Sequence, residues 1–325
     1  MSFRFFKRFQ IAPGLTVNLS KSGLSLSVGP RGAKVTLGPK GARTTVGIPG
    51  TGVSYTKHHP YGKRAPAPAP ARTPRNDAER CLLSACQALD GQQTAVALEH
   101  LRRVGTLPDA CWMAGFLLLE AKRLDEALAA FEAAHARAEV LGESFDALGV
   151  EIAMELPVTP QLSLSLAPGP QSAALGLVEA LQWLGNPHRA VEVLQGMLAS
   201  EPTDSVVLLS LTELTWDTWK HDQQALEYVL GLTDRLAGDD DLHATLLLYR
   251  ARALRELGRL DAAREVLMKA LSRPKKRSQD VLLALRYERA LVFEARGENR
   301  AARAELEKIL AADAGYEDVR ARLDR

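Results

Sequence analysis

Apolar and polar residues alternate with a period of two along the first part of the chain. Four segments share this pattern and are followed by connectors that contain glycine: 15–19, 24–28, 33–37 and 42–46. Because successive side chains of a strand point to opposite faces, the pattern predicts strands with one apolar and one polar face. Two of the first three connectors also contain proline, which is typical of hairpin turns. We therefore predict a small antiparallel β meander that ends with a short strand at Val53–Tyr55.

The period changes to about 3.6 from Asn76 onward, which predicts amphipathic helices. These helices recur in pairs at a spacing of about 34 residues. The clearest pair is Leu247–Ala270, with a turn that begins at Gly258. Stacked helix pairs bury a continuous core, so the pattern predicts an α-helical solenoid. An alanine marks the same position in successive pairs: Ala127, Ala190, Ala225, Ala263 and Ala302.

Period two returns briefly inside the helical part. Val150–Leu156 and Gln161–Leu166 alternate on either side of a turn with two prolines, Pro157–Pro160. This pattern predicts a β-hairpin insert at about 150–167. The predicted fold class is therefore α+β multidomain, with a small antiparallel β-meander domain and an α-helical solenoid that contains a β-hairpin insert.

A proline-rich stretch separates the two parts. Alanine and proline alternate from Ala65 to Pro70, a composition that favours an extended spacer. We predict a basic antiparallel β domain at 1–57, a Pro/Ala-rich linker at 58–77 and a helical repeat domain at 78–325.

The net charge of +2 hides a strong asymmetry. Residues 1–76 contain thirteen Lys or Arg and no Asp or Glu, while the rest of the chain holds 28 basic and 39 acidic residues. Such a field favours an anionic partner for the first part. The candidate anion-binding face consists of Lys21, Arg31, Lys34, Lys40 and Arg43. Two alternatives remain open: a solvated surface whose charges discourage aggregation, and a contact with the acidic helical part of the same or a neighbouring chain.

The apolar face of the predicted sheet needs a cover, because one thin sheet does not bury its own apolar side. A first candidate is the phenylalanine-rich start, where cations lie between Phe3, Phe5, Phe6 and Phe9. A second copy of the sheet is another candidate. Insertion of the same start into a membrane surface is a third.

Two stretches resemble known families. An FRF pattern at Phe3–Phe5, the SKSG block at Ser20–Gly23 and TVGIPGTGVSY at Thr45–Tyr55 are similar to the bacterial domain of unknown function 4236. That resemblance implies a fold and no activity. The helix pairs over most of 78–325 resemble tetratricopeptide repeats (TPR), although Lys122 stands where the turn glycine is expected.

The TPR resemblance implies a concave groove lined by the first helix of each pair. Aromatic and arginine side chains are frequent anchors of protein interfaces. If the register of the family holds, a partner-binding groove is lined by Trp112, Phe116, Glu179, Gln182, Trp183, Glu213, Trp216, Arg252, Arg255 and Tyr287. Trp side chains packed between helices are the alternative for any single member of this set.

The sequence contains no phosphate-binding loop, zinc-protease motif, nucleophile elbow or dinucleotide fingerprint. Its three cysteines, Cys81, Cys86 and Cys111, show no metal-ligand spacing. We predict no catalytic residue, metal or cofactor, and a cytoplasmic location. The predicted function is a non-enzymatic scaffold whose groove binds a protein or peptide, while the basic β domain serves assembly, self-association or anchoring. The alternative is a module that binds nucleic acid or an anionic membrane surface through the basic β domain.

Overall fold

The computed structural model describes the backbone of five strands between Thr16 and His59, and then residues 73–324. Within the second range, five short stretches are not described: 91–92, 151, 161, 235–237 and 275–276. Side chains are described only from Thr73 onward. Statements about side-chain packing therefore concern the helical part.

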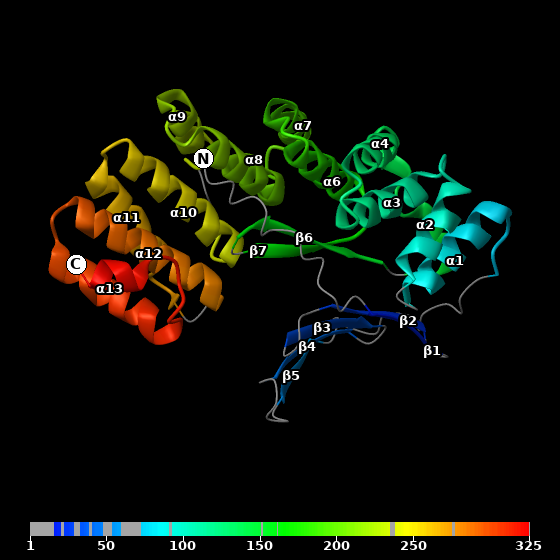
Figure 1. Ribbon diagram of the computed structural model, residues 1–325, viewed down its shortest axis with the longest axis horizontal. Coiled ribbons are helices and arrows are strands. Elements are labelled where there is room, and N and C mark those ends of the chain that lie inside the picture. The colour runs from blue at the N-terminus through cyan, green and yellow to red at the C-terminus, as the bar shows by residue number, and fades with distance from the viewer. Residues whose placement is uncertain are drawn as a thin grey trace. The chain divides into compact units, whose positions relative to one another are not determined.

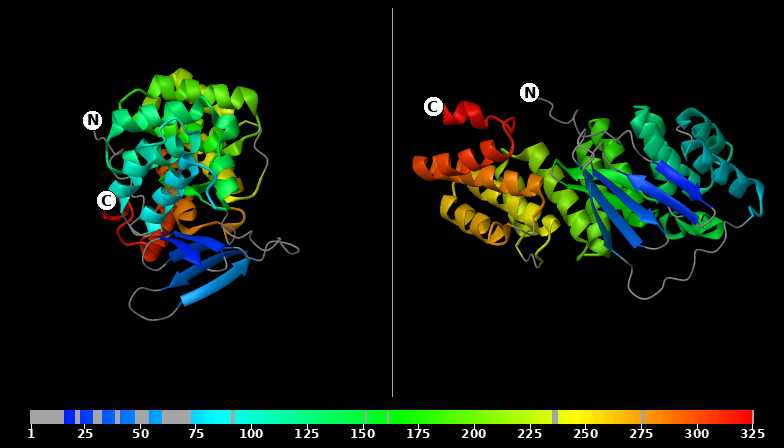
Figure 2. Two further views of the ribbon diagram at one scale, coloured as in Figure 1. Left: turned by 90° about the vertical axis from the view of Figure 1, so that its right-hand side faces the viewer. Right: turned by 90° about the horizontal axis from the view of Figure 1, so that it is seen from below.

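The five strands pair side by side in chain order (Figure 2). Each neighbouring pair is antiparallel, and the register follows the alternation of the sequence. Val17 stands opposite Leu26, for example, and Thr36 stands opposite Arg43. The strands are β1 (Thr16–Ser20), β2 (Gly23–Val28), β3 (Ala33–Gly38), β4 (Gly41–Gly47) and β5 (Ser54–His59).

The predicted α+β multidomain class is wrong for this chain. The structure is predominantly helical, and the class that it supports is an α-helical solenoid. The chain divides into two compact units, and neither of them consists of the five strands alone. The first unit comprises 1–157 and 164–190, and the second comprises 158–163 and 191–325. A separate β-meander domain is not supported, because the five strands do not form a compact unit of their own.

The first unit contains three helix pairs or parts of pairs (Figure 1), and a β-hairpin is divided between the units, because 158–163 belong to the second. Its helices are α1 (Asp77–Asp90), α2 (Thr94–Arg102), α3 (Pro108–Glu120), α4 (Leu124–His135), α5 (Glu143–Leu148) and α6 (Pro170–Trp183). A short 3₁₀ helix, η2 (Ala138–Val140), precedes α5. Strands β6 (Met154–Thr159) and β7 (Leu162–Leu166) form a two-stranded sheet in the stretch where the sequence alternates.

The second unit continues the same helix–turn–helix plan. Its helices begin with the last part of α7 (Pro187–Ser200), and the others are α8 (Ser205–Trp219), α9 (Gln223–Leu232), α10 (Asp241–Glu256), α11 (Leu260–Ala270), α12 (Gln279–Ala295), α13 (Asn299–Ala312) and α14 (Val319–Leu323). Aspartates cap the N-termini of α8, α9 and α10. Each aspartate carboxylate accepts a hydrogen bond from at least one free backbone N–H group in the first turn of its helix. These caps are Asp204, Asp222 and Asp240.

Small residues allow the helices to approach closely in both units. In the first unit, the ring of Phe131 on α4 fills the space in front of two glycines, Gly115 on α3 and Gly176 on α6. A Cβ atom would lie 2.8 Å from that ring at Gly115 and 2.2 Å at Gly176. In the second unit, Ala251 and Ala263 are completely buried where α10 meets α11. These positions fix the separation of the helices and therefore the faces that remain exposed.

Candidate functional site

The first two predicted groove residues lie in the core of the first unit. Trp112 is 0% exposed and Phe116 is 1% exposed. The indole N–H of Trp112 donates a hydrogen bond to the Oγ atom of Ser172 at 2.9 Å. The ring of Phe145 packs edge-on against Trp112, with 6.2 Å between the ring centroids. In the described chain, these two side chains offer no surface to a partner.

A short helix before the β-hairpin provides the cover over Trp112. Helix α5 carries Phe145, and its start is held by Asp109, which is 1% exposed at the beginning of α3. The Asp109 carboxylate accepts hydrogen bonds from the backbone N–H groups of Gly142 at 2.6 Å and Ser144 at 2.9 Å. Because a carboxylate compensates the free N–H groups and the dipole at a helix start, this contact fixes α5 on the first-helix face of the unit.

Three further members of the predicted set lie together on the last turns of α6. Glu179, Gln182 and Trp183 are each partly exposed. The Nζ atom of Lys122 lies 3.8 Å from the centre of the Trp183 ring, which is a cation–π contact. Burial lowers the pKa of Lys122, and the charge of Glu179 acts in the opposite direction. This end of α6 therefore presents an aromatic ring whose face is already occupied by a cation.

Lys122 also explains a departure from the repeat pattern. Its backbone has φ of +58°, in the left-handed region, and the turn glycines Gly185, Gly258 and Gly297 have φ of +74°, +72° and +75°. Lysine thus adopts the conformation that glycine supplies in the other turns, although a side chain makes this conformation costly. The side chain of Lys122, the one non-glycine residue among these four turns, makes the cation–π contact with Trp183.

In the second unit, the two predicted residues of α8 are buried. Glu213 is 3% exposed and Trp216 is 8% exposed. The α8 helix is closely packed along most of its length, and its buried hydroxyl groups bond within the helix, as Thr215 does to the carbonyl of Leu211 at 2.7 Å. As in the case of Trp112, burial removes Glu213 and Trp216 from the surface.

Arg252 and Arg255 lie one helical turn apart on α10 and share one carboxylate. The Nε atom of Arg255 donates to Glu288 of α12 at 2.6 Å, while Arg252 approaches the same carboxylate to 3.7 Å. Glu288 is 2% exposed. Burial acts to lower the pKa of Arg255, but the charges of Glu288 and Glu256 outweigh it and the pKa is raised. The pair therefore joins two successive repeats through a buried carboxylate.

Tyr287, the last predicted groove residue, is partly covered by the end of the chain. Its hydroxyl donates a hydrogen bond to the carboxylate of Asp318, and its ring lies 5.8 Å from that of Tyr316. Burial and the bond to Asp318 raise the pKa of Tyr287 to about 12. Burial raises the pKa of Tyr316, and the charge of Arg252 acts in the opposite direction. We use the name Arg–Tyr surface for four partly exposed residues of α10, α12 and the end of the chain: Arg252, Arg255, Tyr287 and Tyr316.

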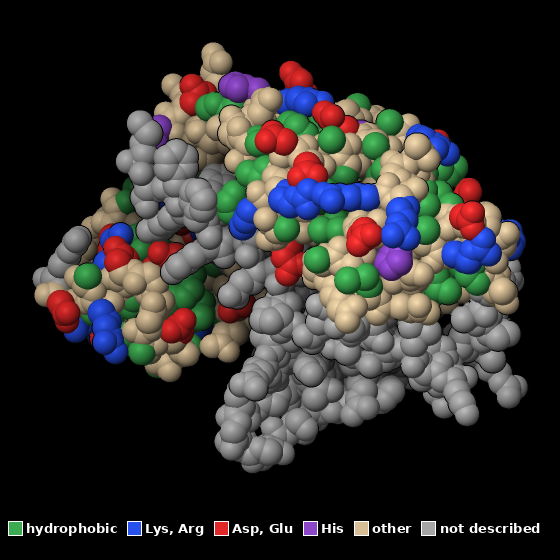
Figure 3. Space-filling model, turned by 45° about the vertical axis from the view of Figure 1, so that its right-hand side comes forward, with side chains coloured by type: hydrophobic (Ala, Val, Ile, Leu, Met, Phe, Trp, Pro, Cys, Tyr) green, Lys and Arg blue, Asp and Glu red, His purple; other side chains and the backbone are tan. Residues whose placement is uncertain are grey.

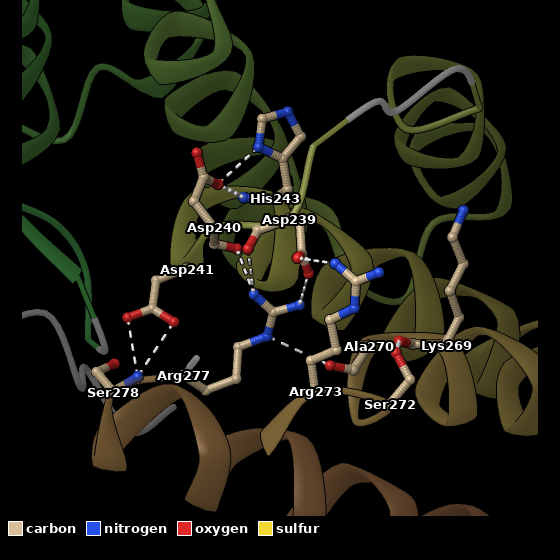
Figure 4. Close-up of polar contacts among 10 residues, drawn as sticks. All are labelled: Asp239, Asp240, Asp241, His243, Lys269, Ala270, Ser272, Arg273, Arg277 and Ser278. Atoms are coloured by element: carbon tan, nitrogen blue, oxygen red, sulfur yellow. Dashed lines mark hydrogen bonds and ion pairs between the residues drawn. The ribbon is translucent and has the colours of Figure 1, made fainter. Parts of the chain in front are cut away.

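A polar cluster around Arg277 connects the same repeats at their other end (Figure 4). The guanidinium group of Arg277 donates to the carbonyls of Asp239 at 3.0 Å, Asp240 at 3.1 Å and Ala270 at 3.3 Å. It also pairs with the Asp239 carboxylate at 3.2 Å, and the Arg277 side chain is 4% exposed. Buried carbonyl groups need donors, so this cluster stabilises the loop before α10 against the turn before α12.

The candidate anion-binding residues are only partly within the described chain. Lys34 lies on β3 opposite Thr45, and Arg43 lies on β4 opposite Thr36 and His58. Lys21, Arg31 and Lys40 lie outside the described residues. The binding of anions by this set stays a prediction.

On the helical part, charged side chains of both signs are interspersed over the face shown in Figure 3. Among the residues that the structure describes, no three His, Cys, Asp or Glu side chains are grouped to hold a metal ion. Within the same residues, no helix is both long enough and apolar enough to cross a membrane.

One feature was not predicted from the sequence, an open groove of about 580 Å³ between α7 and α9. The signals were present in the sequence as a tyrosine on an exposed helix face, Tyr228, and a glycine inside a helix, Gly231. Both residues lie on the second helix of a pair, whereas the predicted partner-binding groove is lined by first helices. The groove is lined by Gln195, Leu198, Ala199, Pro202, Leu208, Tyr228, Gly231, Leu232 and Asp234.

Two stretches of the chain match known families. Residues 3–56 match a protein family of unknown function (DUF4236), and residues 244–276 match the tetratricopeptide repeat. The chain therefore carries a DUF4236 segment followed by a TPR-like helical array, as the resemblance predicted.

Solved structures share the helical fold. The N-terminal domain of the EccA1 ATPase from the ESX-1 secretion system of Mycobacterium tuberculosis is 16% identical, with a TM-score of 0.54 over 76% of this chain and 88% of that chain. TTC0263, a thermophilic TPR protein of Thermus thermophilus, is 20% identical, with a TM-score of 0.41 over 67% of this chain and 97% of that chain. No curated protein sequence matches the chain. The likeness to the EccA1 domain concerns the fold alone.

Proposed function

We propose that this protein is a non-enzymatic interaction scaffold, and that its TPR-like array binds a protein or peptide at the Arg–Tyr surface. The observation that carries the proposal is the loose ion pair of Arg252, whose guanidinium group stays 3.7 Å from Glu288 and 20% exposed. Arginine and tyrosine together offer charge, hydrogen-bond donors and flat apolar area, which is the combination found at binding hot spots. The proposal includes a cytoplasmic location and the division into 1–57, 58–77 and 78–325.

Glu179, Gln182 and Trp183 are the other exposed members of the predicted groove, and we include them as a second contact region in the first unit. Trp183 needs Lys122 to move before a ligand can stack on the covered face of the ring. Arg252 also has an aromatic neighbour, because its guanidinium group lies 5.0 Å from the centre of the buried Tyr249 ring, but the Arg252 side chain itself stays partly exposed. We therefore assign the main contact to the Arg–Tyr surface.

The test compares two charge-removing substitutions in full-length protein. Arg252→Gln removes the cation from the Arg–Tyr surface, and Arg264→Gln removes one from an exposed position on α11 of the same repeat. Proteins captured by the tagged parent chain are quantified against both variants. We expect Arg252→Gln to weaken capture of the specific partner about tenfold, the effect of one charge-assisted contact, and Arg264→Gln to leave it unchanged. Equal capture by all three chains would refute this site.

The basic N-terminal segment, residues 1–57, is proposed to serve assembly or anchoring. One observation favours a second candidate function, the binding of nucleic acid or an anionic membrane surface: the first 76 residues hold thirteen cations and no acid. Such binding weakens steeply with salt and depends little on base sequence. Titration of full-length protein with duplex DNA, RNA and anionic vesicles at about 50 mM salt, and again at about 200 mM, tests it. No binding at the lower concentration would leave assembly as the role of this segment.

A further inference from the structure

The ends of α3 and α6 lie beside each other in the first unit, at the second contact region. Near the starts of the two helices, Trp112 donates a hydrogen bond to Ser172 at 2.9 Å. After their last turns, the Nζ atom of Lys122 lies 3.8 Å from the centre of the Trp183 ring. These contacts are about 15 Å apart along each helix, so α3 and α6 are neighbours that run in the same direction.

The Trp183 ring already holds a cation. The ammonium group of Lys122 lies over its face, while the Trp183 side chain stays partly exposed. This contact is costly for a lysine, because burial lowers the pKa of Lys122 and an ammonium group is strongly hydrated. A guanidinium group is planar and more weakly hydrated, so it stacks on an indole with a smaller loss of hydration.

Two carboxylates lie at the same end of this helix pair. Glu179 precedes Trp183 by one helical turn on α6, and its charge acts on Lys122. Glu120 is the last residue of α3, one turn after Phe116 and two positions before Lys122. It therefore extends the first-helix face of α3 toward the turn that carries Lys122. An aromatic ring and two acidic side chains thus surround the place that the lysine occupies.

Glu120 lacks a counter-charge among the residues that the structure describes. The residue as a whole is exposed, yet burial of its carboxyl group raises its pKa, and no described cation acts to lower it. The arginine nearest to it in sequence, Arg123, donates instead to Glu126 at 2.6 Å. A carboxylate that is partly withdrawn from water and carries no counter-charge favours an incoming cation.

We propose that the ends of α3 and α6 form a binding site for an arginine side chain of the partner. Its guanidinium group stacks on Trp183 and donates hydrogen bonds to Glu120 and Glu179. Lys122 is the internal cation that it displaces. This assignment rests on the proposed function only in taking the arginine from a protein or peptide partner, and it uses no residue of the Arg–Tyr surface.

Fluorine NMR of the full-length chain labelled with 5-fluorotryptophan tests this site. Trp183→Phe assigns the Trp183 signal among the four tryptophans. The probe is N-acetylarginine methylamide, and its neutral isostere, N-acetylcitrulline methylamide, is the control. We expect the arginine probe to move the Trp183 signal along a saturable curve and the citrulline probe to bind at least about threefold more weakly. The signal of Trp219, the last residue of α8, is expected to stay in place.

Two pairs of substitutions test the charged residues. Lys122→Ala removes the competing cation, so the Kd of the arginine probe is expected to fall about three- to fivefold. Lys220→Ala removes a cation at the end of α8 and is expected to leave that Kd unchanged. Glu120→Gln should raise the Kd about threefold, because one carboxylate of the site loses its charge. Glu139→Gln, at an exposed position of η2, is its control and should have no effect.

Three results would overturn the proposal. A Trp183 signal that stays in place during the arginine titration would refute the site, and equal binding of the citrulline probe would show that the site does not select a cation. An unchanged Kd in both Lys122→Ala and Lys122→Gly would show that the lysine is not displaced, and the glycine variant excludes backbone strain as the reason.

The titration needs no partner, so it separates this site from the proposed function. A chain that binds the arginine probe at Trp183, but whose partner capture is unaffected by Arg252→Gln, keeps the arginine site and loses the Arg–Tyr surface. The reverse result refutes only the arginine site.

Discussion

The first helices of the two units differ in what covers them. In the first unit, α5 lies on the first-helix face, held there by Asp109, and its Phe145 covers Trp112. In the second unit, Arg252 and Arg255 stay about one-fifth exposed, although they share the buried Glu288. The contrast holds at these positions and not along whole units, because Trp183 of α6 stays partly exposed and Trp216 of α8 is buried. The segment that packs on a first helix therefore decides which of its side chains stay exposed.

The first prediction breaks the tight packing of the first unit. Gly176→Ala places a Cβ atom 2.2 Å from the Phe131 ring, which is too close for any side chain to remain in place. We expect the free energy of unfolding to fall by about 3 kcal/mol, because overpacking a close-packed core forces side chains and backbone to shift. Urea denaturation measures the change.

Gly196→Ala is the matched control for that substitution, because no atom lies near its Cβ position. It is expected to stabilise the chain by about 0.5 kcal/mol through helix propensity. Adding Phe131→Leu to Gly176→Ala should cost less than the two single changes together, since both act on one contact. Additive losses would contradict the role given to Phe131.

The second prediction concerns the cluster that joins repeats in the second unit (Figure 4). Arg277→Met keeps the apolar stem but leaves three carbonyls without their donor and removes one of the two arginines that pair with the Asp239 carboxylate. We expect a loss of about 2 to 3 kcal/mol in the free energy of unfolding, because buried polar groups lose their partner.

Arg273→Met provides the control, since Arg273 pairs with the same Asp239 carboxylate from a side chain that is 58% exposed. Exposed ion pairs contribute little, so this change is expected to cost less than about 1 kcal/mol. If both arginine variants were destabilised equally, the burial of Arg277 would not explain its importance.

The third prediction loosens the cover of the first unit while the aromatic side chains beneath it stay unchanged. Asp109→Ala deletes the carboxylate that holds the start of α5, and we expect a loss of about 1 to 2 kcal/mol. Amide hydrogen exchange should rise within 143–148, and the emission of the buried Trp112 should shift toward that of a hydrated indole. The matched change in the second unit, Asp204→Ala, also removes a helix cap and should leave exchange within 143–148 unchanged.

The period of the sequence was sufficient to predict the helices. The pair expected at Leu247–Ala270 corresponds to α10 and α11, because a helix must place its apolar side chains on one face. The sequence also placed Arg252 and Arg255 on one face, since residues three apart are neighbours on a helix. It did not identify Glu288, because that partner comes from the next repeat, 33 residues further along.

The period of the sequence does not show which segment covers a helix face. Trp112 was expected in a groove because periodicity gives the direction of a side chain but not the segment that packs on it. Its cover, Phe145, comes from α5, a short helix that the repeat pattern does not predict. The α+β class failed for a related reason: alternation predicts strands, but it does not show that a sheet forms a compact unit by itself.

The last and smallest prediction compares the turns of the two units. Lys122 has a left-handed backbone and a cation–π contact with Trp183, whereas Gly258 adopts the same backbone with open space at its Cβ position. Lys122→Ala keeps the strain and loses the contact, so we expect a loss of about 0.5 to 1 kcal/mol. Lys122→Gly loses the same contact but relieves a strain of about 1 kcal/mol, so its net effect should be within about 0.5 kcal/mol of zero.

In the second unit, Gly258→Ala introduces the strain with no ring to compensate it, and a loss of about 1 kcal/mol is expected in thermal and urea melts. A stabilised Lys122→Ala variant would mean that the lysine was not held over the indole, and Trp183 emission, which should change equally in both Lys122 variants, checks this independently.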